Sequence, residues 1–364
     1  MDQKMMKTLG IVIASFVVFI LVLFFISSCS SNKYTYDKLE EKMMQVAKKY
    51  YEENEKELPS QDKDTRSYTL KKMISDERIQ ELTELFNDEN IKCDGNVTVT
   101  NNNGHFVYTP YLTCGKDYQT TYLKNKIVEN SLVESGPGLY ETADEYIFRG
   151  DVKNNYVSFS GKTFRIIRIN EDGTIRLIDN DGISEVVWDS KYNTTVHDSR
   201  GINDYIVSEN LYANIKTVSD NYYNNNRVWS DDARNYITTQ TLCIGKRSKA
   251  DTTKDGSAEC SLKLENQLFG SLAVYEYLQA SLDINCKSTV SAACTNYNWF
   301  TSIPSGFWTA TADVQTTDNV YTLYKKPQSS LCNSYSHLNV VFNINNNVVY
   351  VSGDGTKKDP YVFK

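Results

Sequence analysis

The chain has 364 residues, of which 23% are charged and 12% aromatic, and its formal net charge is −7. Lysines are interspersed with Asp and Glu, so the sequence lacks the clustered basic side chains that contact phosphates, which argues against nucleic acid as a partner. The length is sufficient for one small and one medium domain, each with its own core.

The most apolar stretch lies near the amino terminus. Residues 9–28 read LGIVIASFVVFILVLFFISS, with no charged side chain, and twenty helical residues span about 30 Å, the hydrocarbon thickness of a bilayer. No second apolar run of that length follows. We therefore expect residues 1–8 to be a cytoplasmic tail, residues 9–28 a single transmembrane signal anchor, and the bulk of the chain to be extracellular.

A lipid anchor is the alternative. Residues 26–29 read Ile-Ser-Ser-Cys and fit a bacterial lipobox, in which the chain is cut before Cys29 and acyl chains are attached to that cysteine. The retained helix is favoured because the apolar run is longer than the about 7–15 residues of an ordinary secretory signal. Both alternatives make the membrane a partner and place the chain at the outer surface of the cell.

The cysteines support an oxidising exterior. Three local pairs, each across a short loop, indicate disulfide bonds. The pairs are Cys93 with Cys114, Cys243 with Cys260, and Cys286 with Cys294. Cys332 is left over as a buried or unpaired thiol. No CxxC motif occurs and no cysteine lies at metal spacing from a histidine, so we expect no metal site.

Residues 34–118 are predicted to form a small domain of helices followed by a β-hairpin. Apolar residues recur at helical spacing in its first part and alternate as in strands in its second part. The helices are expected at 37–58, 69–74 and 76–86, and the two strands at 97–100 and 106–112. Asp76 is the expected N-cap of the third helix.

The first 118 residues resemble the pilin-like or pseudopilin-like module of bacterial surface proteins. The resemblance rests on the apolar amino-terminal helix, the amphipathic segment MMQVAKKYYEENEKELP and the small disulfide-tied sheet. It implies the architecture of that module. It does not imply pilus assembly, because the fifth residue after Gly10 is Ser15, where a prepilin has glutamate.

Residues 119–145 contain the turn sequence Ser-Gly-Pro-Gly and are expected to be a linker, and residues 146–364 a β-rich α+β domain. Four short strands joined by turn dipeptides follow the linker. In the strand sequences TFRIIRIN and TIRLID, apolar residues alternate with Arg165, Arg168 and Arg176. We therefore predict a sheet with one buried face and one solvent-exposed face that carries the arginines.

The remainder of the domain adds helices and further strands. Helix-biased segments cover 203–217 and 230–241, and apolar residues at helical spacing predict a helix at 267–282. Strands are expected at FWTAT, VYTLYK, NVVFNI and NVVYV. The predicted fold class is α+β, with an amino-terminal transmembrane helix, a small helical and hairpin domain, and a β-rich domain.

The carboxy-terminal part resembles a domain of membrane-anchored surface proteins from low-GC Gram-positive bacteria. The resemblance is carried by the segments YIFRG, NNYVSFSGKTFRIIRINEDGTIRLI, FGSLAVYEYLQAS, FWTAT and GDGTKKDPYVF. The layout of that domain is similar to the C-type-lectin-like and formylglycine-generating-enzyme-like fold. The resemblance spans residues 146–363 and implies a twisted β core with long structured insertions.

The sequence contains no GxSxG, HExxH or P-loop pattern, so we expect neither an enzyme nor a cofactor. Residues 179–182 begin like an EF-hand loop but lack its later glycine and glutamate, so calcium is not expected. Aromatic residues beside Asn, Ser and Gly are typical of surfaces that bind sugars or proteins, and the alternative is that they belong to the core. The candidate ligand-binding residues are Tyr222, Tyr223, Tyr297, Trp299 and Trp308.

These observations favour a membrane-anchored extracellular protein that acts in ligand binding or adhesion, with a glycan or a protein as its ligand. The alternative is a minor pilin-like or pseudopilin-like structural component of a surface assembly or secretion apparatus. The two hypotheses differ in their consequences. An assembly subunit would lose its first ten residues and co-purify in fibres, whereas an adhesin would keep them and bind its ligand.

Overall fold

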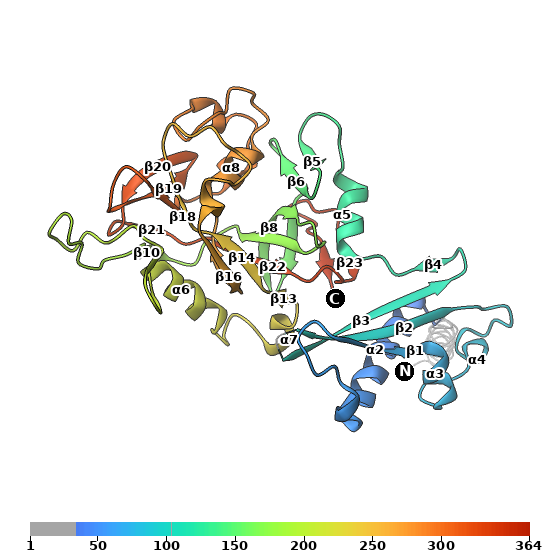
Figure 1. Cartoon of the computed structure of the whole chain (residues 1–364). Coiled ribbons are helices and arrows are strands. Elements are labelled where there is room, and N and C mark those ends of the chain that lie inside the picture. The colour runs from blue at the N-terminus through green and yellow to red at the C-terminus, as the bar shows by residue number, and fades with distance from the viewer. Residues whose placement is uncertain (1–33, 103) are drawn as a thin grey trace, which may run out of the picture. The chain divides into compact units, whose positions relative to one another are not determined.

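The computed structural model describes residues 34–102 and 104–364. The expected cytoplasmic tail, the expected transmembrane helix and Cys29 lie outside these ranges. Among the described residues, no helix is both long enough and apolar enough to cross a bilayer. Helices and sheets are mixed along the chain, which confirms the α+β class (Figure 1).

The described chain forms two compact units. The first contains residues up to Glu53 together with 68–97 and 110–119, and the second contains 54–67, 98–109 and 120–364. A four-stranded sheet has the order β1-β2-β3-β4, and its strands are β1 (Thr65–Thr69), β2 (Asp94–Asn102), β3 (His105–Cys114) and β4 (Tyr118–Gln119). Strands β1, β2 and β3 contribute residues to both units.

The helices of the first unit are α2 (Tyr36–Glu53), α3 (Leu70–Ser75) and α4 (Leu82–Phe86). Helix α2 buries the apolar stripe that its spacing predicted, namely Leu39, Met43, Val46 and Ala47. The predicted helix at 76–86 is shorter, because Glu77 takes a positive φ of 55° directly after α3. Asp76 consequently lies at the carboxyl end of α3 and does not cap α4.

The second unit is built on an eight-stranded sheet in the order β13-β22-β9-β8-β6-β5, in which β17 also pairs with β22 and β7 with β8. Its strands are β5 (Gly138–Glu141), β6 (Tyr146–Arg149), β7 (Tyr156–Phe159), β8 (Lys162–Ile169), β9 (Ile175–Asp179), β13 (Ile237–Thr238), β17 (Phe269–Ser271) and β22 (Val340–Ile344). Strands β7, β8 and β9 pair antiparallel, as their turn dipeptides predicted. Gly161 and Gly173 take positive φ in the two connecting turns, a conformation that glycine adopts without steric cost.

A second sheet has the order β10-β21-β18-β19-β20, and β15 pairs with β18. Its strands are β10 (Glu185–Val187), β15 (Lys246–Arg247), β18 (Phe307–Asp313), β19 (Asn319–Tyr324), β20 (Lys326–Leu331) and β21 (Tyr335–His337). Three two-stranded ribbons complete the strands. They are β11 (Ile206–Ser208) with β12 (Leu211–Tyr212), β14 (Gln240–Cys243) with β16 (Lys263–Gln267), and β23 (Tyr350–Ser352) with β24 (Val362–Phe363).

The α-helices of the second unit are α5 (Leu123–Ser131), α6 (Asn214–Tyr223), α7 (Asp231–Arg234) and α8 (Val274–Ala280), and the 3₁₀ turns are η1 (Glu55–Glu57), η2 (Glu259–Ser261), η3 (Ala292–Thr295) and η4 (Trp299–Ser302). The helix predicted at 267–282 is therefore less than half its expected length, because α8 has 7 residues. Its first residues form β17, because Phe269 pairs with Phe342 of β22. Burial of this cross-strand pair overrides the helical spacing of the sequence.

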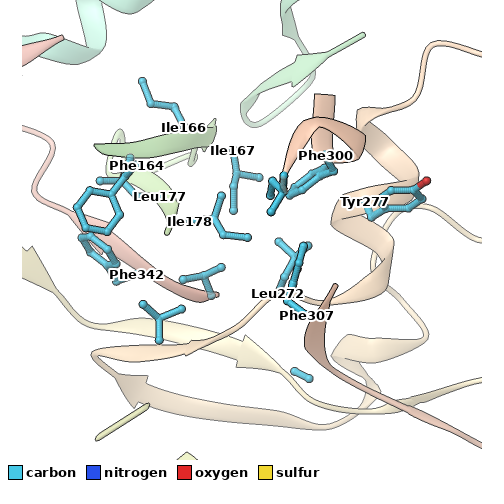
Figure 2. Close-up of a cluster of buried hydrophobic side chains, with 14 of the residues drawn as sticks. Phe164, Ile166, Ile167, Leu177, Ile178, Leu272, Tyr277, Phe300, Phe307 and Phe342 are labelled. Atoms are coloured by element: carbon cyan, nitrogen blue, oxygen red, sulfur yellow. The ribbon is translucent and has the colours of Figure 1, made fainter. Parts of the chain in front are cut away.

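The hydrophobic core occupies both faces of the eight-stranded sheet. Figure 2 shows Ile167 and Ile178 on the side of Phe300 and the α8 residue Tyr277. On the other face, the rings of Phe164 and Phe342 meet edge to face, with their centroids 5.1 Å apart. Both faces of the central strands are thus covered by other parts of the unit.

The predicted solvent-exposed face of β8 and β9 is wrong. Arg165, Arg168 and Arg176 are all buried, and none is more than 7% exposed. The reason is that η4 and α8 pack on the face that the alternation assigned to solvent. Arginines are rarely buried unless their charge is paired or hydrogen-bonded. This face of the sheet must therefore contain the groups that pair with the three arginines.

All three predicted disulfides are confirmed. The structure joins Cys93 to Cys114, Cys243 to Cys260, and Cys286 to Cys294. Among the residues that the structure describes, Cys332 is the free cysteine, and it is buried. Burial raises the pKa of its thiol well above the ordinary value, so the thiolate needed for reaction does not form near neutral pH.

The disulfide pattern predicts the order in which cysteines react. Iodoacetamide should leave Cys332 unlabelled in the folded chain, label it once the chain is unfolded without reductant, and label the six paired cysteines only after reduction. Peptide mass spectrometry of residues 34–364 measures each step. Labelling of any of the six before reduction would contradict the pairing.

Candidate functional site

A row of polar side chains crosses the eight-stranded sheet. Arg168 on β8 lies opposite Arg176 on β9, Arg176 lies opposite Asn343 on β22, and Asn343 lies opposite Thr238 on β13. Directly opposite residues on neighbouring antiparallel strands point to the same face of a sheet. The four side chains therefore form one continuous polar row on one face.

A β-bulge puts Arg168 into this row. Ile166 pairs with Leu177 and Arg168 pairs with Arg176, so β8 has one more residue than β9 in this interval. The extra residue reverses the facing of the positions that follow it. Arg165 pairs with Ile178, which shares its face with Arg176. The bulge therefore places Arg165 and Arg168 on the same face although they are three residues apart.

The carboxylate of Glu276, on α8, lies between the two arginines of the row. Its Oε1 accepts a hydrogen bond from Arg176 Nε at 2.6 Å and another from Arg168 Nη2. Its Oε2 accepts from Arg176 Nη2 at 3.1 Å and from the backbone N–H of Ala273 at 3.0 Å. One fully buried carboxylate thus joins β8, β9 and the start of α8.

The arginines decide the ionisation of Glu276. Burial alone would raise the pKa of this carboxyl, but the charges of Arg176 and Arg168 outweigh burial and lower the pKa to about 2. For Arg168, burial would lower the pKa of the guanidinium, and the nearby Tyr275, Glu276 and Glu145 raise it instead. Glu276 and Arg168 therefore both stay charged across the physiological pH range.

The remaining contacts complete the network and balance its charge. Arg168 Nη1 donates to Glu145 Oε2 at 3.0 Å, and Arg168 Nη2 donates to the hydroxyl of Tyr275 at 3.0 Å. Arg176 Nη1 donates to Gln240, whose own amide donates to two backbone carbonyls. Two guanidiniums and the two carboxylates of Glu276 and Glu145 thus give a cluster with no net charge.

A second buried ion pair holds the wall beside this cluster. Glu259 Oε1 accepts from Arg247 Nε at 2.8 Å and from the backbone N–H of Tyr275 at 3.0 Å, and both paired side chains are fully buried. Glu259 belongs to the loop closed by the Cys243–Cys260 disulfide. This loop is therefore fixed to the first turn of α8, where Glu276 also lies.

A cavity of about 520 Å³ opens onto the cluster, and we call it the Glu276 cavity. Its lining includes Arg168, Arg176, Glu276, Tyr275, Ser271 and Asn343. Two side-chain atoms of the polar row are buried and have no hydrogen-bond partner, namely Arg168 Nε and Asn343 Oδ1. Buried polar atoms are normally paired, and unpaired ones are explained by strain, a functional role or a bound water or ion.

Three of the aromatic residues predicted to bind a ligand lie in the core. Trp299 and Trp308 are fully buried, and their indole N–H groups donate to the carbonyls of Phe148 and Val186. Tyr222 is on α6, with its ring against Trp229 and its hydroxyl accepting from Lys162 Nζ at 2.6 Å. These contacts give the three side chains a packing role. The structure does not bring them into the Glu276 cavity.

The other two candidates keep exposed ring area. Tyr223 is half-buried at the end of α6, and the guanidinium of Arg234 lies 5.6 Å from the centroid of its ring. Tyr297 is 64% exposed and follows the loop closed by Cys286 and Cys294. Ligand binding by these tyrosines stays a prediction.

One sequence signal could have identified the cluster. Arg165 and Arg168 are three residues apart in TFRIIRIN, so strict alternation cannot place both on one exposed face. Two arginines in an apolar strand, together with a single glutamate in the apolar segment of α8, indicate buried pairing.

No protein-family model, no curated protein and no solved structure matches the chain.

The buried cluster predicts a large cost for neutralising its carboxylate. Glu276→Gln leaves two buried guanidiniums without their shared counter-charge, so the free energy of unfolding at neutral pH should fall by about 3–5 kcal/mol. Urea unfolding of the wild-type chain and of the variant measures this difference in the free energy of unfolding. The matched control, Glu129→Gln, removes the carboxylate from an exposed pair with Lys126 and should change stability little.

The same variants predict a pH dependence. The folded pKa of Glu276 is below its ordinary value of 4.5, so the stabilisation by its charge is complete above that value and is lost as the pH falls towards 2. The difference between the wild-type chain and Glu276→Gln should therefore shrink over this interval. A difference that stays constant down to acid pH would contradict the charged state of Glu276.

Proposed function

We propose that the chain is a membrane-anchored extracellular surface protein that binds a ligand in the Glu276 cavity and acts in ligand capture or adhesion. The observation that carries this proposal is the cavity itself, where buried charged side chains lie beside two polar atoms without partners, Arg168 Nε and Asn343 Oδ1. Small-molecule sites are concave, and a few fixed, convergent polar groups in them orient the ligand.

The protonation states favour binding over catalysis. A general acid or base works best with a pKa near the ambient pH. In this cavity the pKa of Glu276 is about 2, the pKa of Arg168 is raised, and burial raises the pKa of Tyr275. These groups hold their protons or their charge near neutral pH, so they suit orientation of a ligand.

The extracellular location is supported by two independent features. Disulfides persist in oxidising compartments, and three of them close loops in this chain. Residues 9–28 are long and apolar enough to anchor the chain in a membrane. The proposal includes a pilin-like first region and a lectin-like second region. The general layout of the two units, with helix α2 in the first and a β-rich second unit, supports these likenesses.

A structural subunit of a surface assembly is the second candidate. It is favoured by α2, whose apolar residues Leu39, Met43, Val46 and Ala47 are buried while its other side carries charged residues. Such a helix, following an apolar amino terminus, suits packing within an assembly. Recovery of the chain from sheared fibres, with its first ten residues removed, would favour this candidate.

The binding proposal predicts that blocking the cavity abolishes ligand capture. Thr241 is exposed on β14 at the cavity lining, and Thr241→Trp should fill the mouth without touching the buried ion pairs. We expect the full-length chain in nanodiscs to bind at least one component of arrays of saccharides and extracellular-matrix proteins. Thr241→Trp should weaken this binding by about tenfold or more, since it excludes the ligand.

The control variant is Thr241→Val, which keeps the side-chain volume and leaves the mouth open, and it should bind like the wild type. Equal binding by the Trp and Val variants would contradict the cavity as the site.

The extracellular location has its own test. Protease added to intact cells should degrade residues 34–364. Protection of these residues from the protease would contradict an extracellular chain.

A further inference from the structure

Four aromatic rings of the first unit gather at the start of α2. Tyr34 precedes this helix, Tyr36 is its first residue, Phe86 ends α4 and Tyr118 begins β4. The ring centroids of Tyr34 and Tyr36 lie 5.4 and 5.3 Å from that of Phe86. Tyr36 also stacks on Tyr118, with the centroids 5.0 Å apart. We call these four residues the entry cluster.

The Cys93–Cys114 disulfide holds the segments that carry these rings. Cys114 on β3 pairs with Tyr118 across the β3–β4 turn, and Cys93 follows shortly after Phe86 in the sequence. The hydroxyl of Tyr118 donates to Asp37 Oδ1 at 3.1 Å, which connects β4 to the first turn of α2. The arrangement of the rings is therefore fixed before any partner arrives.

The rings of the entry cluster are amphipathic in their setting. All four are partly exposed, and none belongs to the fully buried core of the described chain. Three of them are tyrosines, in which an apolar ring ends in a polar hydroxyl. Such rings suit a boundary between water and an apolar phase, and tyrosine is enriched where a membrane meets water.

The apolar run places a bilayer close to the entry cluster. This run ends at Ser28, and residues 29–33 separate it from Tyr34. An extended chain spans at most about 3.6 Å per residue, so the link holds Tyr34 within about 20 Å of the end of the run. Among the aromatic residues that the structure describes, Tyr34 and Tyr36 are the nearest along the chain to this run.

The charges beside the entry cluster are of both signs. Exposed residues next to the rings in the sequence include Asp37, Asp88 and Asp117 as well as Lys38 and Lys116. The described residues of this surface thus lack the run of basic side chains that attracts anionic lipids. The rings, and not a net charge, distinguish this surface, so a zwitterionic lipid is sufficient as its partner.

We propose that the entry cluster lies in the headgroup layer of the bilayer in which residues 9–28 are anchored. The proposal rests on the membrane anchor of the proposed function. The rings replace contact with water by contact with lipid, while the tyrosine hydroxyls stay among the polar headgroups. Because the cluster includes the first residue of α2, this contact also fixes the direction in which that helix leaves the membrane surface.

The test places a fluorescent reporter in the entry cluster. Phe86→Trp is made in the full-length chain, which is incorporated into phosphatidylcholine nanodiscs with and without lipids that carry a nitroxide on the headgroup. The four native tryptophans are fully buried in the second unit, and the signal of the wild-type chain is subtracted. A nitroxide quenches tryptophan at close range, so the added fluorescence of Phe86→Trp should largely be lost.

The matched control is Glu52→Trp. Glu52 is exposed in the last turn of α2, and at 1.5 Å per residue it lies about 24 Å along the helix from Tyr36. Its added fluorescence should be retained. Tyr34→Trp is a second reporter within the entry cluster, and it decides the result if Phe86→Trp does not fold.

Each of the other results overturns a stated claim. If the full-length chain stays soluble and does not enter nanodiscs, the anchor of the proposed function is wrong. If the chain enters nanodiscs and neither cluster reporter is quenched more than Glu52→Trp, the inference is wrong while the anchor stands. Quenching that needs phosphatidylglycerol and disappears at about 1 M salt, where the Debye length is about 3 Å, would indicate a contact made by charge and would overturn the role of the rings.

Discussion

The shared carboxylate of Glu276 is the interaction on which the second unit depends. A carboxylate in the interior loses its hydration, and only strong compensation keeps it charged there. Arg168 and Arg176 provide it through hydrogen bonds from two different strands. The same bonds fix α8 against the sheet, because Glu276 belongs to that helix. Removing Glu276 would leave Arg176 buried without this carboxylate and Arg168 with Glu145 alone, so the cluster is costly to break.

The contrast with Arg165 shows what the carboxylate contributes. Arg165 is buried on the same face, but its hydrogen bonds go to Asn155, Ser302 and a backbone carbonyl, and its guanidinium lies between the rings of Tyr156 and Trp299. Burial lowers the pKa of Arg165 to about 10. A buried arginine held by neutral partners thus loses basicity, whereas Arg168, beside carboxylates, gains it. Arg165 fills a structural position, and Arg168 keeps a free N–H at a cavity.

The disulfide loop and the ion pair next to it place the cavity wall. Cys243 lines the cavity and is bonded to Cys260, and the neighbouring Glu259 is paired with Arg247 and bonded to the backbone of α8. These contacts restrain a long connection that would otherwise be mobile. The cavity is therefore bounded by a sheet, a helix and a covalently closed loop, an arrangement that preorganises its polar groups before a ligand binds.

Local features of the fold were predictable from the sequence, and contacts between distant residues were not. The disulfides join cysteines with sequence separations of 21, 17 and 8, and the turns between β7, β8 and β9 use glycines, so short-range rules identify them. The cluster joins Glu276 to residues 108 and 100 positions away, and a bulge decides which face Arg168 occupies. The alternation of apolar residues and arginines predicts exposed arginines, because this pattern contains no information on the elements that cover a sheet. Composition likewise cannot distinguish a binding surface from the core for Trp299 and Trp308, which the structure buries.

The most direct test of this account is the titration of the Glu276 side chain itself. With glutamate carboxyl carbons labelled in the full-length chain, and Glu276→Gln used to assign the signal, the carboxyl resonance is followed as the pH is lowered. The account predicts that Glu276 stays ionised after exposed glutamates have protonated near their ordinary value of about 4.5. A Glu276 signal that titrates together with them in the folded chain would contradict it.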